Sequence, residues 1–294
     1  MGLAAIQPVT LGAVERSVLV LGRISDDPKA HYDQLKPLLD YVVPRMREAG
    51  IVEGRILMAR DAQQMASYLR RGRVDWVTET AGTAMALQQR AAAQPLLLTE
   101  RSGVGAYQSV FFVRRDSPLA RLEDLKGRTL AMQSVLSTSA YLVPAMELLE
   151  HGVQPEILLT PSDAPAADTV GYVFARSELN ISTYVHKRVV DAGVISSIDW
   201  NDDRSMPPAF RSDMRVLYRS EPIPRALEMV RGDLDPAVRE RLREVLLEAS
   251  RDPFAGPALA KFFGTTGFYP VDADSRQALN RLRNGLARIR MEVE

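Results

Sequence analysis

The sequence predicts an α/β protein built from two lobes. Short apolar runs alternate with segments in which apolar residues recur at helical spacing, and this alternation is typical of parallel βαβ units in a doubly wound sheet. The pattern changes near Gly103, where a second series of strands and helices begins. We therefore expect two α/β lobes, with the chain crossing between them twice.

In the first lobe, each predicted element follows from periodicity and a glycine stop. Leu35, Leu38, Leu39, Val42, Val43 and Met46 recur at helical spacing up to Gly50, and Ala62, Met65, Ala66 and Leu69 do so up to Gly72. The predicted strands are residues 17–22, 55–59 and 74–77, and the predicted helices are residues 35–49, 62–71 and 82–90.

The second half of the chain continues this pattern. We predict strands at residues 107–113, 128–132 and 214–218, and helices at 122–127, 142–149, 238–249, 257–263 and 275–290. Residues 221–224, Glu-Pro-Ile-Pro, form a stiff extended connection, because proline fixes its own φ and restricts the residue before it. The last helix is basic and amphipathic.

Composition excludes several classes of function. Lys+Arg and Asp+Glu both total 37 in 294 residues, so no global basic field is available to hold nucleic acid or an anionic membrane. The absence of cysteine excludes disulfides, thiolate metal sites and a cysteine nucleophile. No apolar run is long enough to span a bilayer. We expect a monomer without cofactor or metal, in which any anion site is local.

The first eight residues lack a basic region and an apolar core long enough for a complete signal peptide. They are either the remnant of a leader or a start from which the leader has been removed.

The polar stretch Ser137-Thr138-Ser139-Ala140-Tyr141 lies between a predicted strand and a predicted helix. Such a loop gathers free backbone N–H groups and hydroxyls at the positive end of the helix dipole, which attracts an anion. The alternative is that one of these residues is only an N-cap, and both roles can coexist in one helix start. Pro144 is expected to bend the helix and to leave a carbonyl unpaired.

The order of these segments resembles the PhnD-like family, the periplasmic phosphonate-, phosphite- and phosphate-binding proteins of ABC transporters. The resemblance extends from about Leu19 to Val271 and is carried by residues 69–75, 107–117, 122–128, the Ser-Thr-Ser-Ala-Tyr loop, 189–194 and 219–224. It implies the two-lobed type II periplasmic-binding-protein fold, in which each lobe is a mainly parallel sheet flanked by helices and two strands form the hinge. Lobe 1 would then comprise residues 17–105, completed by 220–294, and lobe 2 residues 106–219.

The resemblance also implies a function. It predicts a periplasmic or otherwise extracytoplasmic receptor, not an enzyme, that closes on a small phosphonate-, phosphite- or phosphate-like oxyanion and delivers it to an ABC permease. Carried over by position, Ser137, Thr138 and Ser139 become the anion cradle, with Tyr141 alongside.

Other candidate ligand-binding residues follow predicted strands. Thr80 and Thr83 can donate hydroxyl hydrogen bonds at a helix start, although capping explains them equally well. Glu79 would be repelled by a bound dianion unless it meets an amine of the ligand or points away. Tyr107 begins the crossing strand and either lines the cleft or is an ordinary half-buried tyrosine.

Four further candidates lie in the second lobe. Glu178 and Asn180 can bind a cationic or hydroxyl group of a ligand, and the alternative is a solvated helix start. Ser196 and Asp199 follow the carboxyl end of a strand, where open α/β sheets bind ligands, and the alternative is a turn with an Asx cap.

Two departures leave the ligand open. The family commonly shows a histidine in a Ser-His-Asp-like stretch, whereas residues 161–164 here read Pro-Ser-Asp-Ala, and no arginine or lysine is obviously placed at the predicted loops. The alternatives are a non-phosphorus organic ligand, or a sensing module of the same fold that reports to a membrane signalling protein. An enzyme using Glu79 or Asp199 as base lacks a histidine near any nucleophile. The three histidines show no metal-ligand spacing.

Overall fold

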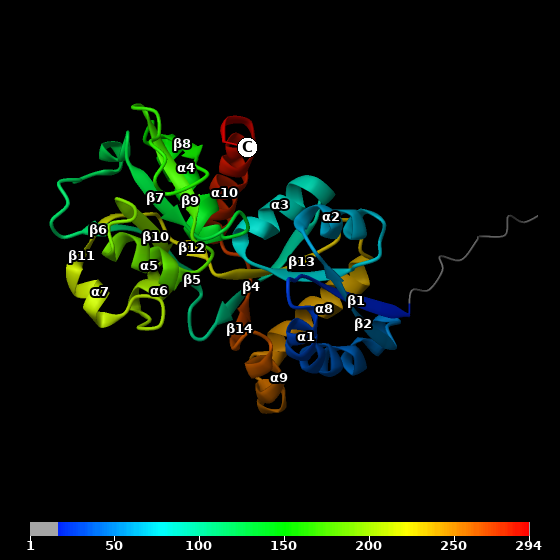
Figure 1. The fold of residues 1–294 in the computed structure, drawn as a ribbon. Helices are drawn as coiled ribbons and strands as arrows, with labels where there is room; N and C mark the ends of the chain where they lie inside the picture. The colour runs from blue at the N-terminus through cyan, green and yellow to red at the C-terminus, as the bar shows by residue number, and fades with distance from the viewer. Residues whose placement is uncertain (1–16, 294) are drawn as a thin grey trace, which may run out of the picture.

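The computed structural model describes residues 17–293 and contains two six-stranded sheets, which confirms the expected two-lobed α/β architecture (Figure 1). The leader remnant proposed for the first eight residues lies outside the described residues. The strands are β1 (Val18–Ile24), β2 (Glu53–Ala59), β3 (Trp76–Glu79), β4 (Gln94–Arg101), β5 (Ala106–Tyr107), β6 (Ser109–Arg114), β7 (Thr129–Met132), β8 (Gln154–Ile157), β9 (Thr169–Phe174), β10 (Ala192–Ser196), β11 (Met214–Arg219), β12 (Ile223–Pro224), β13 (Ala226–Val230) and β14 (Thr265–Tyr269). The helices are α1 (Pro28–Val42), η1 (Val43–Ala49), α2 (Ala62–Arg70), α3 (Ala81–Ala91), η2 (Leu122–Leu125), η3 (Thr138–Leu142), α4 (Val143–Glu150), α5 (Glu178–His186), α6 (Ser197–Asn201), α7 (Pro208–Asp213), α8 (Pro236–Ala249), η4 (Pro253–Ala255), α9 (Gly256–Lys261) and α10 (Ala273–Glu292).

Local sequence sets many of the helix boundaries. Helices α2, α5 and α10 begin where the side chains of Asp61, Ser177 and Asp272 accept hydrogen bonds from N–H groups of the first turn. Helix η1 ends at Gly50, whose φ of 79° lies in the left-handed region that favours glycine. These boundaries agree with the capping and glycine signals in the sequence.

The first sheet has the order β14-β4-β13-β3-β1-β2. Strand β1 pairs in parallel with β2 and β3, whereas β13 runs antiparallel between β3 and β4. Strands β13 and β14 come from the last third of the chain, so this sheet is completed only after the chain has returned from the other sheet. The carboxyl ends of β1, β3 and β4 therefore lie at the same edge as the start of β13.

The second sheet has the order β11-β6-β10-β7-β9-β8. Strands β10, β7, β9 and β8 are parallel, and β6 runs antiparallel to both β10 and β11. All six strands come from the continuous stretch 109–219. The carboxyl ends of β7, β9 and β10 lie together at one edge.

The two crossings between the sheets pair with each other. Strands β5 and β12 form a two-stranded antiparallel sheet in which Tyr107 is opposite Ile223 and Ala106 is opposite Pro224. The single strand predicted at 107–113 is thus divided at Gln108, whose N–H bonds the hydroxyl of Ser197 at 3.1 Å instead of a sheet neighbour. In Figure 1 these short strands lie between the two lobes.

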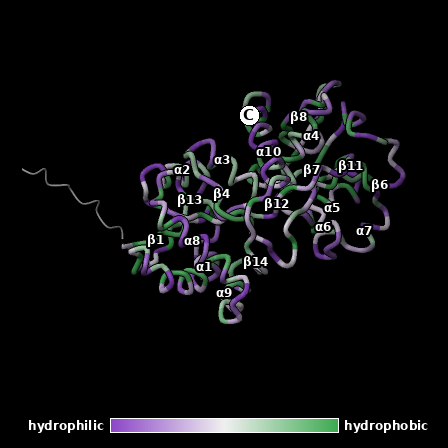
Figure 2. Tube along the Cα trace, turned by 180° about the vertical axis from the view of Figure 1, so that it is seen from behind, coloured by the Kyte–Doolittle hydropathy of each residue, from purple (hydrophilic) through white to green (hydrophobic). Residues whose placement is uncertain are grey.

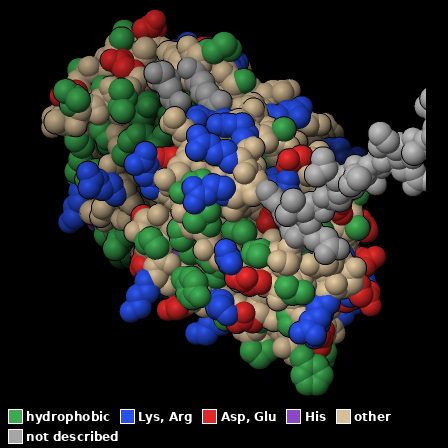
Figure 3. Space-filling view, turned by 90° about the vertical axis from the view of Figure 1, so that its right-hand side faces the viewer, with side chains coloured by type: hydrophobic (Ala, Val, Ile, Leu, Met, Phe, Trp, Pro, Cys, Tyr) green, Lys and Arg blue, Asp and Glu red, His purple; other side chains and the backbone are tan. Residues whose placement is uncertain are grey.

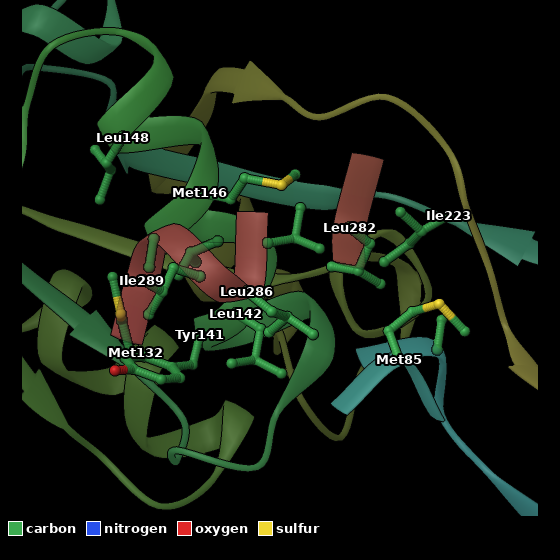
Figure 4. Packing of buried hydrophobic residues seen from close by; sticks show 14 of the residues in the cluster. Met85, Met132, Tyr141, Leu142, Met146, Leu148, Ile223, Leu282, Leu286 and Ile289 are labelled. Carbon is green, nitrogen blue, oxygen red and sulfur yellow. The ribbon is translucent and has the colours of Figure 1, made fainter. Parts of the chain in front are cut away.

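Helix α10 packs against helices of both lobes. Its apolar face, Leu279, Leu282, Leu286 and Ile289, is at most 4% exposed and belongs to one hydrophobic cluster with Met85 of α3 and Met146 of α4. Figure 4 shows Leu282, Leu286 and Ile289 of α10 near Met85, Met146 and Ile223 of β12. The last helix therefore joins the lobes on the side of the crossing strands.

The surface agrees with the balanced composition. Figure 2 shows hydrophobic residues concentrated along the interior strands, with hydrophilic residues on the loops and outer helix faces. On the face seen in Figure 3, basic and acidic side chains are interspersed. Among the described residues, no helix has both the length and the apolar character needed to cross a membrane.

The seam between α10 and α4 is tight enough to test by substitution. A Cβ at Gly285 would lie 2.2 Å from Met146 Sδ and 2.6 Å from its Cγ. We expect Gly285→Ala to lower the free energy of unfolding by about 1–3 kcal/mol through overpacking, measured by urea denaturation. Gly256→Ala is the control, because a Cβ at that position would meet no other atom within 4 Å. Equal stability of the two variants would contradict the packing argument.

Candidate ligand-binding site

A cavity of about 340 Å³ lies between the two lobes, where strand ends meet the crossing segments. Thr80 follows β3, Gln133 follows β7, Ser196 ends β10 and Tyr107 ends β5. Open α/β sheets bind ligands at such carboxyl ends. The lining residues are Thr80, Tyr107, Gln133, Ser134, Leu136, Ser137, Thr138, Ser139, Glu178, Ser196, Ile198, Asp199 and Arg225.

A proline in the following helix shapes the loop at residues 133–140. Because Pro144 has no N–H, the carbonyl of Ala140, four residues earlier, lacks its helical partner. This carbonyl instead accepts a hydrogen bond from the N–H of Gln133 at 3.1 Å, and the first turn of the helix widens to the π-helix η3. The proline thus closes the loop onto the end of β7.

The loop combines a helix cap with free donors. Ser137 is the N-cap, because its Oγ accepts the N–H of Ala140 at 3.1 Å. The N–H groups of Thr138 and Ser139 make no hydrogen bond to the described residues. The capping role predicted as an alternative for this stretch is therefore filled by Ser137, while the next two amides remain available beside the cavity.

Thr138 bridges the lobes at the edge of the cavity. Its Oγ1 accepts the N–H of Gly82 at 3.1 Å and donates to Oγ1 of Thr80 at 3.0 Å. Gly82 is required for this approach, since a Cβ there would lie 2.7 Å from Thr138 Oγ1. The start of α3 and the start of η3 therefore meet through backbone and hydroxyl groups.

Tyr107 ends the crossing strand β5 and lines the cavity together with Ser139 and Thr138. Burial raises the pKa of Tyr107 above its usual value, so the phenol stays protonated at neutral pH. The guanidinium of Arg225 lies over the tyrosine ring, 5.1 Å from its centroid. The lining of the cavity thus combines hydroxyls, free amides and a cation.

Two acidic side chains, Glu178 and Asp199, also line the cavity. Burial and the nearby charge of Asp199 raise the pKa of Glu178. Asp199 accepts a hydrogen bond from the hydroxyl of Ser196, and Ser196 Oγ in turn accepts the N–H of Asp199 at 3.0 Å, which caps α6. Among the described residues, no group of three or more His, Cys, Asp and Glu side chains is arranged to hold a metal ion.

Four of the predicted site residues do not line the cavity. Tyr141 is 1% exposed and packs edge-on against Phe174, with ring centroids 5.2 Å apart. Thr83 lines a separate apolar hollow with Leu136 and Leu142. Asn180 donates from Nδ2 to the carbonyl of Ala175 at 2.8 Å.

Glu79 is the fourth. Its Oε2 pairs with Arg23 at 2.9 Å and its Oε1 accepts the N–H of Ile24 at 3.0 Å. The carboxylate is thereby neutralised within the first lobe, so the repulsion expected between Glu79 and a bound anion does not apply. The cavity brings together the other eight predicted residues, namely Ser137, Thr138, Ser139, Thr80, Tyr107, Glu178, Ser196 and Asp199.

Arg225 is the main residue that sequence reasoning missed. The expectation that no arginine or lysine stands near the predicted loops is wrong, because Arg225 lines the cavity directly after β12. Its position in the sequence could have indicated this role, because Arg225 directly follows the stiff Pro-Ile-Pro connection that returns the chain to the first lobe. Gln133, Ser134, Leu136 and Ile198 also line the cavity without having been predicted.

The role of Pro144 is testable by hydrogen exchange. We expect Pro144→Ala to supply an N–H that competes for the Ala140 carbonyl, so that the amide of Gln133 exchanges at least roughly tenfold faster, a loss of about 1.4 kcal/mol in protection. Pro208→Ala is the control, because that proline occupies the first turn of α7, where the N–H has no helical partner. Unchanged protection of Gln133 would contradict the account of the loop.

Comparison with known proteins places the chain in a family. The family model described as ABC transporter, phosphonate, periplasmic substrate-binding protein matches residues 23–276. The structure of XAC2383 from Xanthomonas citri bound to ATP is 57% identical in sequence, with a TM-score of 0.88, covering 95% of this chain and 100% of that one. The structure of the same protein bound to chloride ion gives the same identity and TM-score over 94% of this chain and all of that one.

A more distant structure shows the same fold. PhnD1 from Prochlorococcus marinus in complex with methylphosphonate is 16% identical, with a TM-score of 0.63, covering 93% of this chain and 99% of that one. Because the match covers 93% of this chain, both lobes share the type II periplasmic-binding-protein fold of that structure. The family match over 23–276 agrees with the resemblance seen in the sequence, and the chain belongs to the periplasmic phosphonate substrate-binding proteins of ABC transporters.

Proposed function

We propose that this chain captures a small phosphonate-type oxyanion in the cavity between its lobes and delivers it to an ABC permease. The observation that carries the proposal is the loop at 137–139, which presents free N–H groups and hydroxyls to the cavity. A tetrahedral oxyanion with several acceptor atoms matches such a cluster of donors. The ligands of two related structures, methylphosphonate for PhnD1 and ATP for XAC2383, both contain a phosphorus oxyanion.

Lobe closure supplies the mechanism. The lining residues come from the first lobe, the second lobe, the crossing strand β5 and the residue after β12, so a ligand in the cavity contacts groups whose separation changes when the hinge moves. The ligand therefore favours the closed arrangement by the difference between its affinities for the two states. No bond is made or broken in this cycle.

The cavity accepts more than a bare phosphoryl group. Its volume of about 340 Å³ lies at the lower end of the range for small-molecule sites, roughly 300–1,000 Å³. The carboxylates of Glu178 and Asp199, which line the same cavity, favour a hydrogen-bond donor or a cation on the ligand. A phosphonate that carries an amine or hydroxyl fits this polarity, and the ATP-bound relative makes a nucleotide the second candidate.

Ser139 is the residue with which to test the oxyanion site, because its hydroxyl lines the cavity without capping the helix. We expect Ser139→Ala to weaken methylphosphonate binding by roughly ten- to hundredfold, since a hydrogen bond to a charged group contributes about 1.5–3 kcal/mol. Isothermal titration with phosphate, methylphosphonate, sulfate and ATP measures the effect. Ser162→Ala, at an exposed position of the same lobe, is the control.

A native chain that binds no phosphorus oxyanion, or a Ser139→Ala variant that binds as tightly as the native chain, would reject the proposed ligand site.

The acidic side chain of Glu178 predicts a second effect on ligand preference, which can be measured separately from the effect of Ser139→Ala. We expect Glu178→Gln to reduce the preference for aminoethylphosphonate over methylphosphonate by roughly tenfold, because the partner charge of the amine is lost. Methylphosphonate affinity itself is expected to change little. Competition titrations with the two ligands measure the ratio, and an unchanged preference would remove Glu178 from the amine site. Glu123→Gln, on the distant helix η2, is the control.

A further inference from the structure

Arg225 lines the ligand cavity, and among the described residues its guanidinium contacts an aromatic ring but no counter-charge. Its Nε is buried and has no hydrogen-bond partner among the described residues, and no hydrogen bond or ion pair of its guanidinium is found there either. A half-buried guanidinium without a counter-charge is costly unless a ligand provides one. The guanidinium lies over the ring of Tyr107, 5.1 Å from its centroid.

The backbone fixes where this cation is presented. Arg225 lies between β12 and β13, and its N–H donates to the carbonyl of Gly105 at 2.8 Å, which ties the two crossings together. Tyr107, under the guanidinium, lines the same cavity as Ser139. The cation therefore reaches the cavity from the crossing segment after β12, whereas Ser139 reaches it from the second lobe.

The wall behind Arg225 adds positive charge. Arg23 and Arg101 both stack on Phe263, with guanidinium carbons 4.9 and 4.5 Å from the ring centroid. Burial, together with repulsion from Arg23 and Arg225, lowers the pKa of Arg101 to about 10. This means that it stays protonated at neutral pH.

Two carboxylates compensate part of the positive charge of Arg23, Arg101 and Arg225. Glu79 pairs with Arg23, and Glu228 is linked to Arg101 through the hydroxyl of Thr78. Of these three arginines, Arg225 is the one that lines the cavity and has neither carboxylate as its partner.

We propose that Arg225 completes the oxyanion site from the crossing segment and makes the receptor prefer a doubly charged phosphoryl group over a singly charged anion of the same shape. Neutral O–H and N–H donors bind a phosphonate and a sulfonate in similar geometry, whereas a guanidinium binds the dianion more tightly because its attraction scales with the charge. Arg225 would be a specificity-determining residue. This inference rests on the proposed function of the same cavity.

The experiment compares two isosteric ligands, methylphosphonate and methanesulfonate, together with ATP, by isothermal titration of the whole chain at a pH above the second pKa of the phosphonate. We expect Arg225→Gln to weaken the binding of methylphosphonate by roughly ten- to hundredfold. The binding of methanesulfonate should weaken by much less. Arg225→Lys, which keeps the charge and loses the planar fork, should recover part of the preference.

The control is Arg219→Gln, which removes an exposed arginine at the end of β11 that does not line the cavity. The melting temperature of each unliganded variant shows whether the fold is kept. If Arg225→Gln unfolds the chain, Arg225→Lys and Arg225→Met are compared in the same way, and the charge-keeping variant must retain the preference for the dianion.

Arg225→Gln binding methylphosphonate like the native chain, or losing both ligands to the same degree, would overturn the inference while the proposed function stands. The native chain could instead bind no phosphonate but bind ATP, with an affinity that falls in Arg225→Gln. That result would reject the proposed phosphonate ligand and support the role of Arg225 in binding a phosphoryl group. Binding of none of these anions would reject both.

Discussion

The close approach of α3 to the serine loop is the constraint on which the cavity depends. The hydroxyl of Thr138 bonds both Gly82 and Thr80, and it can do so only because Gly82 has no side chain. Behind this contact, the apolar face of α10 packs against α3 and α4 in one continuous cluster. The polar contact therefore closes one wall of the cavity, and the apolar seam sets how near the two lobes lie.

A buried polar network supports the first-lobe wall of the site. Glu228, in the middle of β13, is fully buried and accepts hydrogen bonds from Trp76 Nε1 at 2.6 Å, Thr78 Oγ1 at 2.8 Å and Thr99 Oγ1 at 2.7 Å. Arg101 donates to the same Thr78 hydroxyl at 3.0 Å. Because three neighbouring strands contribute, the strand ends that face the cavity are held in register. A carboxylate with so many donors is satisfied although it is buried.

The sequence predicts the parts of the structure that depend on the pattern of apolar and polar residues within one segment. The alternation of strands and helices predicts both lobes, and the Ser-Thr-Ser stretch predicts a polar loop at a helix start. Strand β13 was not predicted, because Glu228 interrupts its run of apolar residues. The hydrogen-bond partners of that carboxylate lie more than a hundred residues away in the sequence. The pairing of Glu79 with Arg23 and the position of Arg225 over Tyr107 likewise depend on contacts between distant segments, which one sequence without its fold does not reveal.

The sheet topology has a consequence for how the chain folds. The second sheet is made of consecutive strands, so it can assemble as soon as residues 109–219 are available. The first sheet has to wait, because β13 inserts between β3 and β4 after more than a hundred intervening residues have been made. Long-range strand pairing of this kind is slow and leaves apolar edges open in the meantime. A chain that emerges from a ribosome or a membrane pore would therefore hold its first helices and strands unfinished until its last third arrives, which is the interval in which a chaperone would act.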